Sequence, residues 1–212
     1  MSGKLIVARH SESEWNLKGV WTGITNVSLT EKGHADAKKI GEILRDLKFD
    51  KIYTSQLKRA NETRDDLLAT YGKTDADQRR TAAINERDYG DYTGMNKWEV
   101  EKTVGEEAFT DIRRAFDAPI PNGETLRDVS ERVVPWYREI VLPQLLSDKN
   151  ILIVAHGNSD RALRKYLENV SDEGVKELEM DFDKVYIYEV ANDGRATSTE
   201  MRQIETDKSH KY

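Results

Sequence analysis

The chain has 212 residues, no cysteine and a formal net charge of -6, with 37% hydrophobic and 34% charged residues. This length suits one large domain or two small ones, and the composition excludes disulfides and cysteine-based metal sites. Since no apolar run nears the roughly 20 residues that cross a bilayer and no basic tract offsets the acidity, we expect a cytoplasmic protein without membrane or nucleic-acid partners.

Short apolar runs predict five strands, at residues 4–8, 51–54, 81–84, 150–155 and 185–190. The first and fourth runs contain LIVA and ILIVA, which are apolar throughout instead of alternating with polar residues. Continuous apolar runs are typical of strands that are covered on both faces, as in a parallel sheet.

Stretches of helical periodicity between the strands predict helices over residues 30–47, 57–71, 96–116, 124–146 and 159–169. Thr30 is a suitable N-cap for the first helix, and Gly72 is placed to end the second. The third is expected to break near Gly105, and Pro135 and Pro143 should bend or divide the fourth.

Strands that alternate with helices predict an α/β fold with a mostly parallel central sheet and helices on both faces. No linker or low-complexity segment divides the chain, so we expect one domain over residues 1–193. The polar residues 194–212 are predicted to be a loosely held tail.

Two of the four histidines, His10 and His156, directly follow the two continuous apolar strands. Ligands of open parallel sheets bind beyond the carboxyl ends of the strands, so neighbouring strands would bring both imidazoles to one rim. The alternative is that each histidine is a strand-end residue bonded to a nearby carbonyl. Two histidines in the same setting favour a functional site.

Arginines near these positions point to phosphate as the ligand. Arg9 precedes His10, Arg59 follows a strand, and Arg113 and Arg114 are adjacent. Guanidinium groups match phosphate oxygens bidentately, although any single arginine would ordinarily be a solvated surface residue. HGN at residues 156–158 places small residues at a helix start, where backbone N–H groups meet anions.

A metal site is not expected, because the sequence has no HxH or HExxH spacing. An imidazole beside phosphate-binding arginines can instead attack phosphorus and carry the phosphoryl group. A carboxylic acid, its pKa raised by burial or nearby anions, would protonate the departing oxygen. Glu86 in INERDYG is the best candidate, and the alternative for it is a surface loop glutamate.

Seven phrases occur in order from about residue 4 to 190: RHSESEWN, TG at 22–23, TSQLKRA, NERDYGDYTGMNK, RRAFD, NGETL and AHGNSDRAL. Together they resemble the cofactor-dependent phosphoglycerate mutases of the histidine phosphatase superfamily. The resemblance implies that His10 is the phosphorylated nucleophile, held with Arg9, Arg59 and His156, and that Glu86 is the acid–base residue.

The resemblance also implies a substrate pocket. Its expected members are Asn16, Thr22, Gly23, Tyr89, Lys97, Arg113, Arg114, Gly157 and Asn158. Gly157 would allow close backbone approach, and Arg113 with Arg114 would hold the substrate carboxylate. Lys97 follows Asn96, a suitable N-cap, so its ammonium and the positive end of a helix would both face an anion.

The expected activity is the interconversion of 3-phosphoglycerate and 2-phosphoglycerate, primed by 2,3-bisphosphoglycerate as cofactor and without metal. The substrates would be small phosphoglycerates. The alternatives are a phosphatase of the same superfamily and a non-catalytic phospholigand-binding protein. Related enzymes are dimers, tetramers or monomers, so a homo-oligomer is suspected and the oligomeric state is left open.

Several departures from the family pattern, including a different turn at Thr25 and Asn26, bear on the balance between mutase and phosphatase activity. Ser11 stands where glycine is usual, and Asp160 stands where an apolar residue is usual. EMDFDK, at residues 179–184, replaces a Pro-Thr-Gly phrase. A cap segment of longer relatives is also missing. No departure removes a predicted catalytic group.

Overall fold

The computed structural model describes residues 2–72 and 74–206 and shows a single α/β domain. One sheet has the strand order β3-β2-β4-β1-β5-β6. The strands are β1 (Leu5–Arg9), β2 (Lys51–Ser55), β3 (Asp77–Thr81), β4 (Ile151–Ala155), β5 (Lys184–Val190) and β6 (Ala196–Gln203). The first four are parallel to one another, and β5 and β6 are antiparallel additions. The predicted mostly parallel α/β fold is confirmed.

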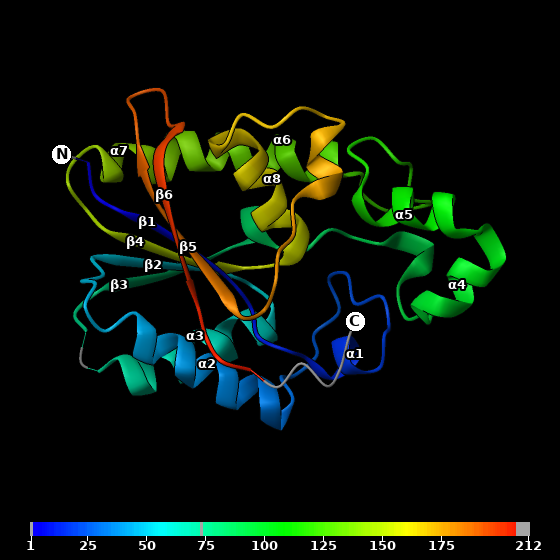
Figure 1. Cartoon of the computed structure of the whole chain (residues 1–212), viewed down its shortest axis with the longest axis horizontal. Coiled ribbons are helices and arrows are strands. Elements are labelled where there is room, and N and C mark those ends of the chain that lie inside the picture. The colour runs from blue at the N-terminus through cyan, green and yellow to red at the C-terminus, as the bar shows by residue number, and fades with distance from the viewer. Residues whose placement is uncertain (1, 73, 207–212) are drawn as a thin grey trace.

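Helices cover both faces of this sheet, as predicted (Figure 1). The α-helices are α1 (Glu14–Leu17), α2 (Glu31–Ile43), α3 (Lys58–Tyr71), α4 (Lys97–Val104), α5 (Glu106–Arg114), α6 (Leu126–Trp136), α7 (Leu142–Leu145) and α8 (Gly157–Leu167). Short helical turns are η1 (Ala82–Ile84), η2 (Gly90–Tyr92), η3 (Tyr137–Val141) and η4 (Gly174–Glu177). Helices α2 and α3 lie on one face, and α6, α7 and α8 lie on the other.

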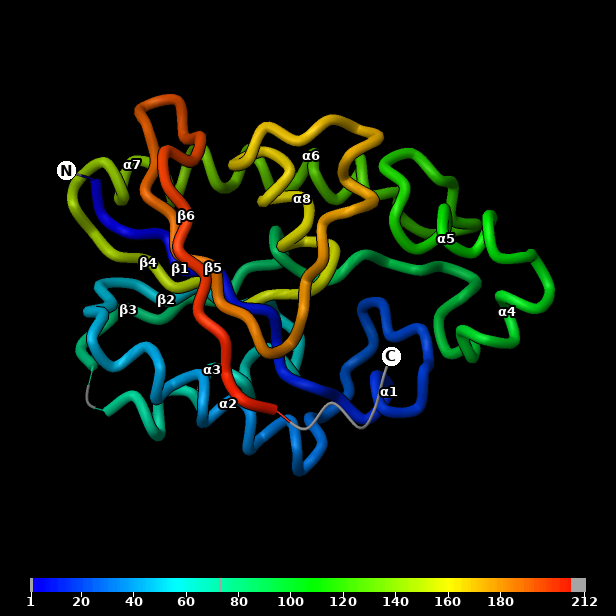
Figure 2. The backbone as a smooth tube through the Cα atoms, in the orientation of Figure 1, coloured from blue at the N-terminus to red at the C-terminus, as the bar shows by residue number. Residues whose placement is uncertain are grey.

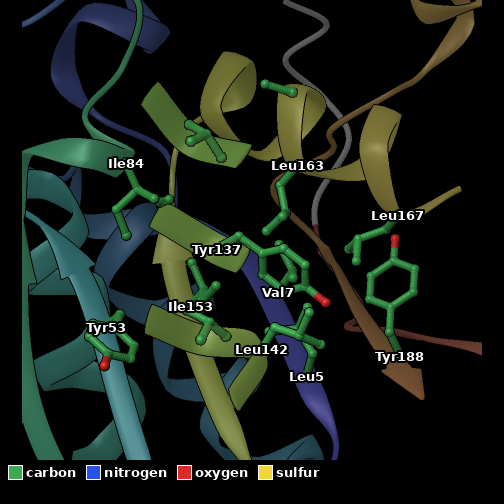
Figure 3. Close-up of a cluster of buried hydrophobic side chains, with 14 of the residues drawn as sticks. Leu5, Val7, Tyr53, Ile84, Tyr137, Leu142, Ile153, Leu163, Leu167 and Tyr188 are labelled. Carbon is green, nitrogen blue, oxygen red and sulfur yellow. The ribbon is translucent and has the colours of Figure 1, made fainter. Parts of the chain in front are cut away.

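The continuous apolar strands are explained by two separate cores. Leu5 and Val7 of β1 pack into the cluster beneath α6 and α8, part of which Figure 3 shows. Ile6 and Ala8 point to the opposite face and pack against α2 and α3. Because successive strand residues alternate between faces, a strand covered on both sides must be apolar at every position.

Several predicted helix boundaries have the expected local causes. The Thr30 hydroxyl accepts a hydrogen bond from the Gly33 N–H at 3.0 Å and caps α2. Gly105 has a φ of 85° and separates α4 from α5. Pro135 lies inside α6, and a π-helical turn follows it before α7 begins. These observations confirm the predicted cap, the break and the division of the long helix.

Two predictions near the sheet edges are wrong. Residues 81–84 are not a strand: β3 ends at Thr81 and a 3₁₀ turn follows. The edge strand β3 has the polar sequence DQRRT, and its exposed position requires no apolar alternation. The predicted tail is also wrong in part, since Ala196–Gln203 form β6, paired with β5. Residues 207–212 lie outside the described part of the chain.

The arrangement of strands and helices leaves one end of the sheet for a site. Figure 2 traces β1 and β4 toward the end of the molecule where α4 and α5 lie, apart from the helices that cover the sheet. Gly157 and Asn158, at the start of α8 after β4, line a pocket together with Lys97 of α4 and Arg113 of α5. Within residues 2–72 and 74–206, no helix is long and apolar enough to cross a membrane.

Candidate active site

Neighbouring parallel strands bring the two histidines together. Strands β1 and β4 pair with Arg9 opposite Ala155, so His10 and His156 leave the sheet side by side. The backbone N–H of His10 donates to the Ala155 carbonyl at 2.9 Å. The centroids of the His10 and His156 rings are 5.0 Å apart. Both side chains are buried. The sequence left the strand order open, and the structure shows the adjacency that the hypothesis required.

The hydrogen bonds of His10 define which ring nitrogen can react. Nδ1 lies 2.7 Å from the Ser11 carbonyl, which can only accept, so Nδ1 carries the proton. The Arg59 Nε–H donates to Nε2 at 3.2 Å, so Nε2 holds a lone pair. Burial, with the charges of Arg59 and Arg9, lowers the pKa of His10 well below its usual value. His10 is therefore a neutral imidazole with its lone pair on Nε2.

Within the described part of the chain, His156 has a hydrogen-bond partner at Nε2 and none at Nδ1. The Leu57 N–H donates to the Ser55 hydroxyl at 3.1 Å, and that hydroxyl lies 2.6 Å from His156 Nε2. If the hydroxyl donates to Nε2, the proton of His156 is on Nδ1. Among residues 2–72 and 74–206, His156 Nδ1 is buried without a hydrogen-bond partner. With that tautomer, His156 has an unused donor on a ring whose centroid is 5.0 Å from that of His10.

Two guanidinium groups lie near the His10 imidazole. Arg59 is buried, and its terminal nitrogens donate to the Thr25 and Gly23 carbonyls, each at 2.9 Å. Burial lowers the pKa of Arg59 to about 10, which leaves it charged at neutral pH. Arg9 donates from Nη1 to the Met180 carbonyl at 2.6 Å. The pair creates a positive field where a phosphoryl group would meet Nε2.

A cavity with two lobes adjoins these groups. The near lobe is lined by His10 and Arg59, with the predicted residues Asn16, Thr22 and Gly23. The distal lobe adds the predicted residues Arg113, Arg114, Gly157 and Asn158. Arg9, Glu86, Tyr89 and Lys97 line both lobes. The structure therefore brings the predicted site residues to these two lobes except His156, whose ring centroid is 5.0 Å from that of His10.

The near lobe has polar groups suited to an anion. In the described part of the chain, Thr22 Oγ1 and Arg9 Nε are buried without hydrogen-bond partners. The Oδ1 atom of Asn16 accepts from the Ser13 hydroxyl at 2.7 Å, so its amide nitrogen is the group available to donate to a ligand. Buried donors of this kind ordinarily find partners, and phosphate oxygens would provide them.

Glu86 is a carboxylate in this structure. Its Oε1 accepts from the Arg87 N–H at 2.8 Å and from both the backbone and side-chain nitrogens of Asn158 at 3.1 Å. Burial acts to raise the pKa of Glu86, but these N–H donors and the charges of Arg59 and Arg9 together lower it. The expected raised pKa is wrong for the ligand-free protein. The sequence predicted that backbone N–H groups at the start of α8 meet an anion. In the structure that anion is the Glu86 carboxylate, which accepts from the Asn158 backbone N–H.

Arg161 is a site residue that the sequence reasoning missed. Its Nη1 donates to Asn158 Oδ1 at 2.9 Å, which turns the Asn158 amide nitrogen toward Glu86 and toward the Tyr89 hydroxyl, 2.9 Å away. Its Nε donates to the Leu178 carbonyl at 3.1 Å. The signal was present, because Arg161 lies one helical turn after Asn158 within the phrase AHGNSDRAL.

The distal lobe gathers the second group of cations. Asn96 caps α4, as predicted, with Oδ1 accepting from the Trp98 N–H at 3.0 Å, and this places Lys97 at the helix start. Burial, followed by repulsion from Arg113 and Arg9, lowers the pKa of Lys97 to about 8. Burial also lowers the pKa of Arg113. The cost of crowding these cations would be offset by a bound anion.

Two departures from the family pattern do not line the cavity. Ser11 is buried, and its hydroxyl has no hydrogen-bond partner within the described residues. Asp160 is also buried, and burial together with nearby Glu86 raises its pKa well above the usual value. Asp160 therefore holds a proton more readily than an exposed aspartate does. Within residues 2–72 and 74–206, no cluster of three potential ligands could hold a metal.

The low pKa of Lys97 predicts an alkaline limit for ligand binding. Only its protonated form attracts an anion, so kcat/KM for an anionic substrate should fall as the pH rises through about 8. The check is a pH profile of kcat/KM, in which Lys97→Arg should remove this limb because arginine stays charged. An unchanged limb in Lys97→Arg would assign the titration to another group.

Comparison with known protein families places the chain in one of them. The chain belongs to the histidine phosphatase superfamily (branch 1), whose family model matches residues 5–201. This result confirms the superfamily inferred from the seven sequence phrases.

Individual proteins of known name are also similar to this chain. The chain is 43% identical to a 2,3-bisphosphoglycerate-dependent phosphoglycerate mutase from Mesorhizobium japonicum, over 95% of this chain and 98% of that protein. It is 41% identical to the protein of the same name from Brucella anthropi, with the same coverage. Among solved structures, Bacillus stearothermophilus YhfR is similar with a TM-score of 0.79 and 26% identity, covering 92% of this chain and 94% of that one.

Proposed function

We propose that this protein interconverts 3-phosphoglycerate and 2-phosphoglycerate through a phosphohistidine on His10, primed by 2,3-bisphosphoglycerate. The observation that carries the proposal is the lone pair of His10 Nε2, which lies beside Arg59 at the near lobe of a cavity whose distal lobe is cationic. The names of the two relatives support the same substrates. Such a reaction also favours a cytoplasmic location, where phosphoglycerates are substrates.

In the proposed reaction, His10 Nε2 attacks phosphorus, an N–P bond forms, and the bond from phosphorus to the departing glycerate oxygen breaks. Arg9 and Arg59 would stabilise the charge on the phosphoryl oxygens, and His156 Nδ1–H and Thr22 Oγ1–H are unused donors nearby. The Ser11 carbonyl keeps the His10 proton on Nδ1, and it stabilises the positive charge that develops on the ring.

Glu86 would move the proton that this transfer requires. Bound phosphate would add negative charge beside Glu86 and so raise its pKa, which enables the protonated acid to donate to the departing oxygen. In the reverse direction the carboxylate takes the proton from the accepting hydroxyl. Asn158 and Arg161 would hold Glu86 in place during both transfers.

The charges that line the cavity support the proposed cofactor. One phosphate requires the near-lobe donors, and the carboxylate and second phosphate require the separate cations Lys97, Arg113 and Arg114. When bound, 2,3-bisphosphoglycerate would supply the phosphoryl group that primes His10.

A product assay tests the proposal. The protein is incubated with 2,3-bisphosphoglycerate and 3-phosphoglycerate, and 2-phosphoglycerate is compared with free phosphate. We expect 2-phosphoglycerate to be the main product and its formation to depend on the bisphosphate. Release of free phosphate without 2-phosphoglycerate would contradict the mutase proposal.

Phosphatase activity is the second candidate, because one observation supports it. The pKa of Glu86 is lowered, so it is a carboxylate that can accept a proton from water as well as from the hydroxyl of a phosphoglycerate. The same assay distinguishes the two activities. The non-catalytic alternative has less support, since Ser11 and Asp160, the departures that suggested it, do not line the cavity.

A further inference from the structure

The segment from Leu178 to Phe182 borders the distal lobe and is held by several arginines. Arg161 donates to the Leu178 carbonyl at 3.1 Å, and Arg9 donates to the Met180 carbonyl at 2.6 Å. The Arg9 guanidinium also stacks on the Phe182 ring, 3.8 Å from its centroid. These contacts fix the backbone of a segment in which the chain departs from the usual family phrase.

Within this segment, the side chain of Glu179 lies against a cation of the site. Its Oε1 is 2.5 Å from Arg114 Nη1, and both residues line the distal lobe. The other acidic residue that lines this lobe is Glu86, which is already bonded at the boundary with the near lobe. Arg113 and Lys97 form no ion pair with a carboxylate in the part of the chain that the structure describes.

We propose that Glu179 is a specificity-determining residue that occupies Arg114 and limits how much negative charge a ligand can bring to the distal lobe. The proposal rests on the function proposed above. Glu179 competes with the ligand's anionic group for Arg114. It therefore weakens ligand binding instead of supporting it.

The strength of this competition depends on the ligand. With one phosphate at His10, 3-phosphoglycerate brings a single carboxylate to the distal lobe. 2,3-Bisphosphoglycerate brings a carboxylate and a second phosphate, so its repulsion by the Glu179 carboxylate is greater. Glu179 therefore weakens the binding of 2,3-bisphosphoglycerate more than the binding of 3-phosphoglycerate. This difference would help the bisphosphate to leave or reorient instead of blocking the site.

The substitution Glu179→Gln removes the charge and keeps the shape. The segment should stay in place, because Arg9, Arg161 and Arg164 contact its backbone carbonyls instead of the Glu179 carboxylate. The matched control is Glu177→Gln, which makes the same charge change two residues away. Glu177 is exposed and does not line the cavity.

The test is isothermal titration calorimetry with each ligand, in a His10→Ala background that prevents turnover. Since a partly exposed charge pair contributes up to about 1 kcal/mol, Glu179→Gln should bind 3-phosphoglycerate about two- to fivefold more tightly. The gain for 2,3-bisphosphoglycerate should be larger, and Glu177→Gln should change neither affinity. Unchanged or weaker binding in Glu179→Gln, or an equal gain in Glu177→Gln, would overturn the inference.

Sulfate separates this inference from the proposed function. If the protein with Glu179 intact binds neither phosphoglycerate, the proposed function fails. In that case Glu179→Gln must still bind inorganic sulfate more tightly than the Glu177→Gln control. Equal sulfate affinities would then overturn the role of Glu179 as well.

Discussion

Replacement of His10 with alanine is expected to lower phosphoryl transfer by at least about 10⁴-fold, to the background of the assay. The substitution removes the Nε2 lone pair, and the neighbouring Nε2 of His156 is already engaged with Ser55. Arg9 and Arg59 at the near lobe are guanidinium groups, which stay protonated and do not replace the lost nucleophile. The measurement is the rate of 2-phosphoglycerate formation, with circular dichroism to show that the variant is folded.

The control for this substitution is His34→Ala. His34 lies on α2 and pairs with Asp66 at 2.5 Å, away from the cavity, so its removal should leave the rate within about twofold, as for most surface changes. Mutase activity retained in folded His10→Ala would refute the phosphohistidine mechanism.

Replacement of Glu86 with glutamine is expected to reduce kcat by about 10²- to 10⁴-fold, the usual contribution of a general acid–base group. Glutamine can still accept hydrogen bonds from the Arg87 and Asn158 N–H groups, so the local structure should persist. It cannot take up or release the transferred proton. The loss should therefore appear mainly in kcat, with a smaller change in KM.

Glu139→Gln serves as the matched control for the Glu86 substitution. Glu139 is exposed within η3 and lines neither lobe of the cavity, so the same loss of charge there should leave kcat unchanged. A kcat for Glu86→Gln within threefold of that control would assign the proton transfer to another group.

Much of the fold could be predicted because burial restricts the sequence strongly. Strands β1 and β4 are covered on both faces, so each position must be apolar, and LIVA and ILIVA marked them clearly. The helix starts at Thr30 and Asn96 were predictable because a cap requires a particular side chain. The edge strands β3 and β6 were missed because they are exposed and polar, and backbone pairing forms them.

The site could be predicted where its residues lie close to a strand end. His10, Arg9 and His156 were found because the carboxyl ends of parallel strands meet at one rim. Their exact pairing required the strand order, which the sequence did not contain. The proton positions on the two rings also depended on partners, Ser11 and Ser55, that only the folded chain supplies.

Long-range pairings lay beyond the sequence reasoning. Glu179 and Arg114 are 65 positions apart, and no motif connects them. The pKa of Glu86 was likewise expected to rise through burial, whereas three N–H donors and two arginines shift it the other way. Such outcomes depend on the sum of opposing contacts, which composition and spacing do not determine.

The central claim is that Nε2 of His10 carries the phosphoryl group. The most direct test is to react the protein with 2,3-bisphosphoglycerate, quench it in alkali, and locate the phosphate on the peptide and on the ring by mass spectrometry and nuclear magnetic resonance. We predict one acid-labile phosphate per chain, attached to Nε2 of His10. Phosphate on Nδ1, on another residue, or on no residue at all would contradict the mechanism.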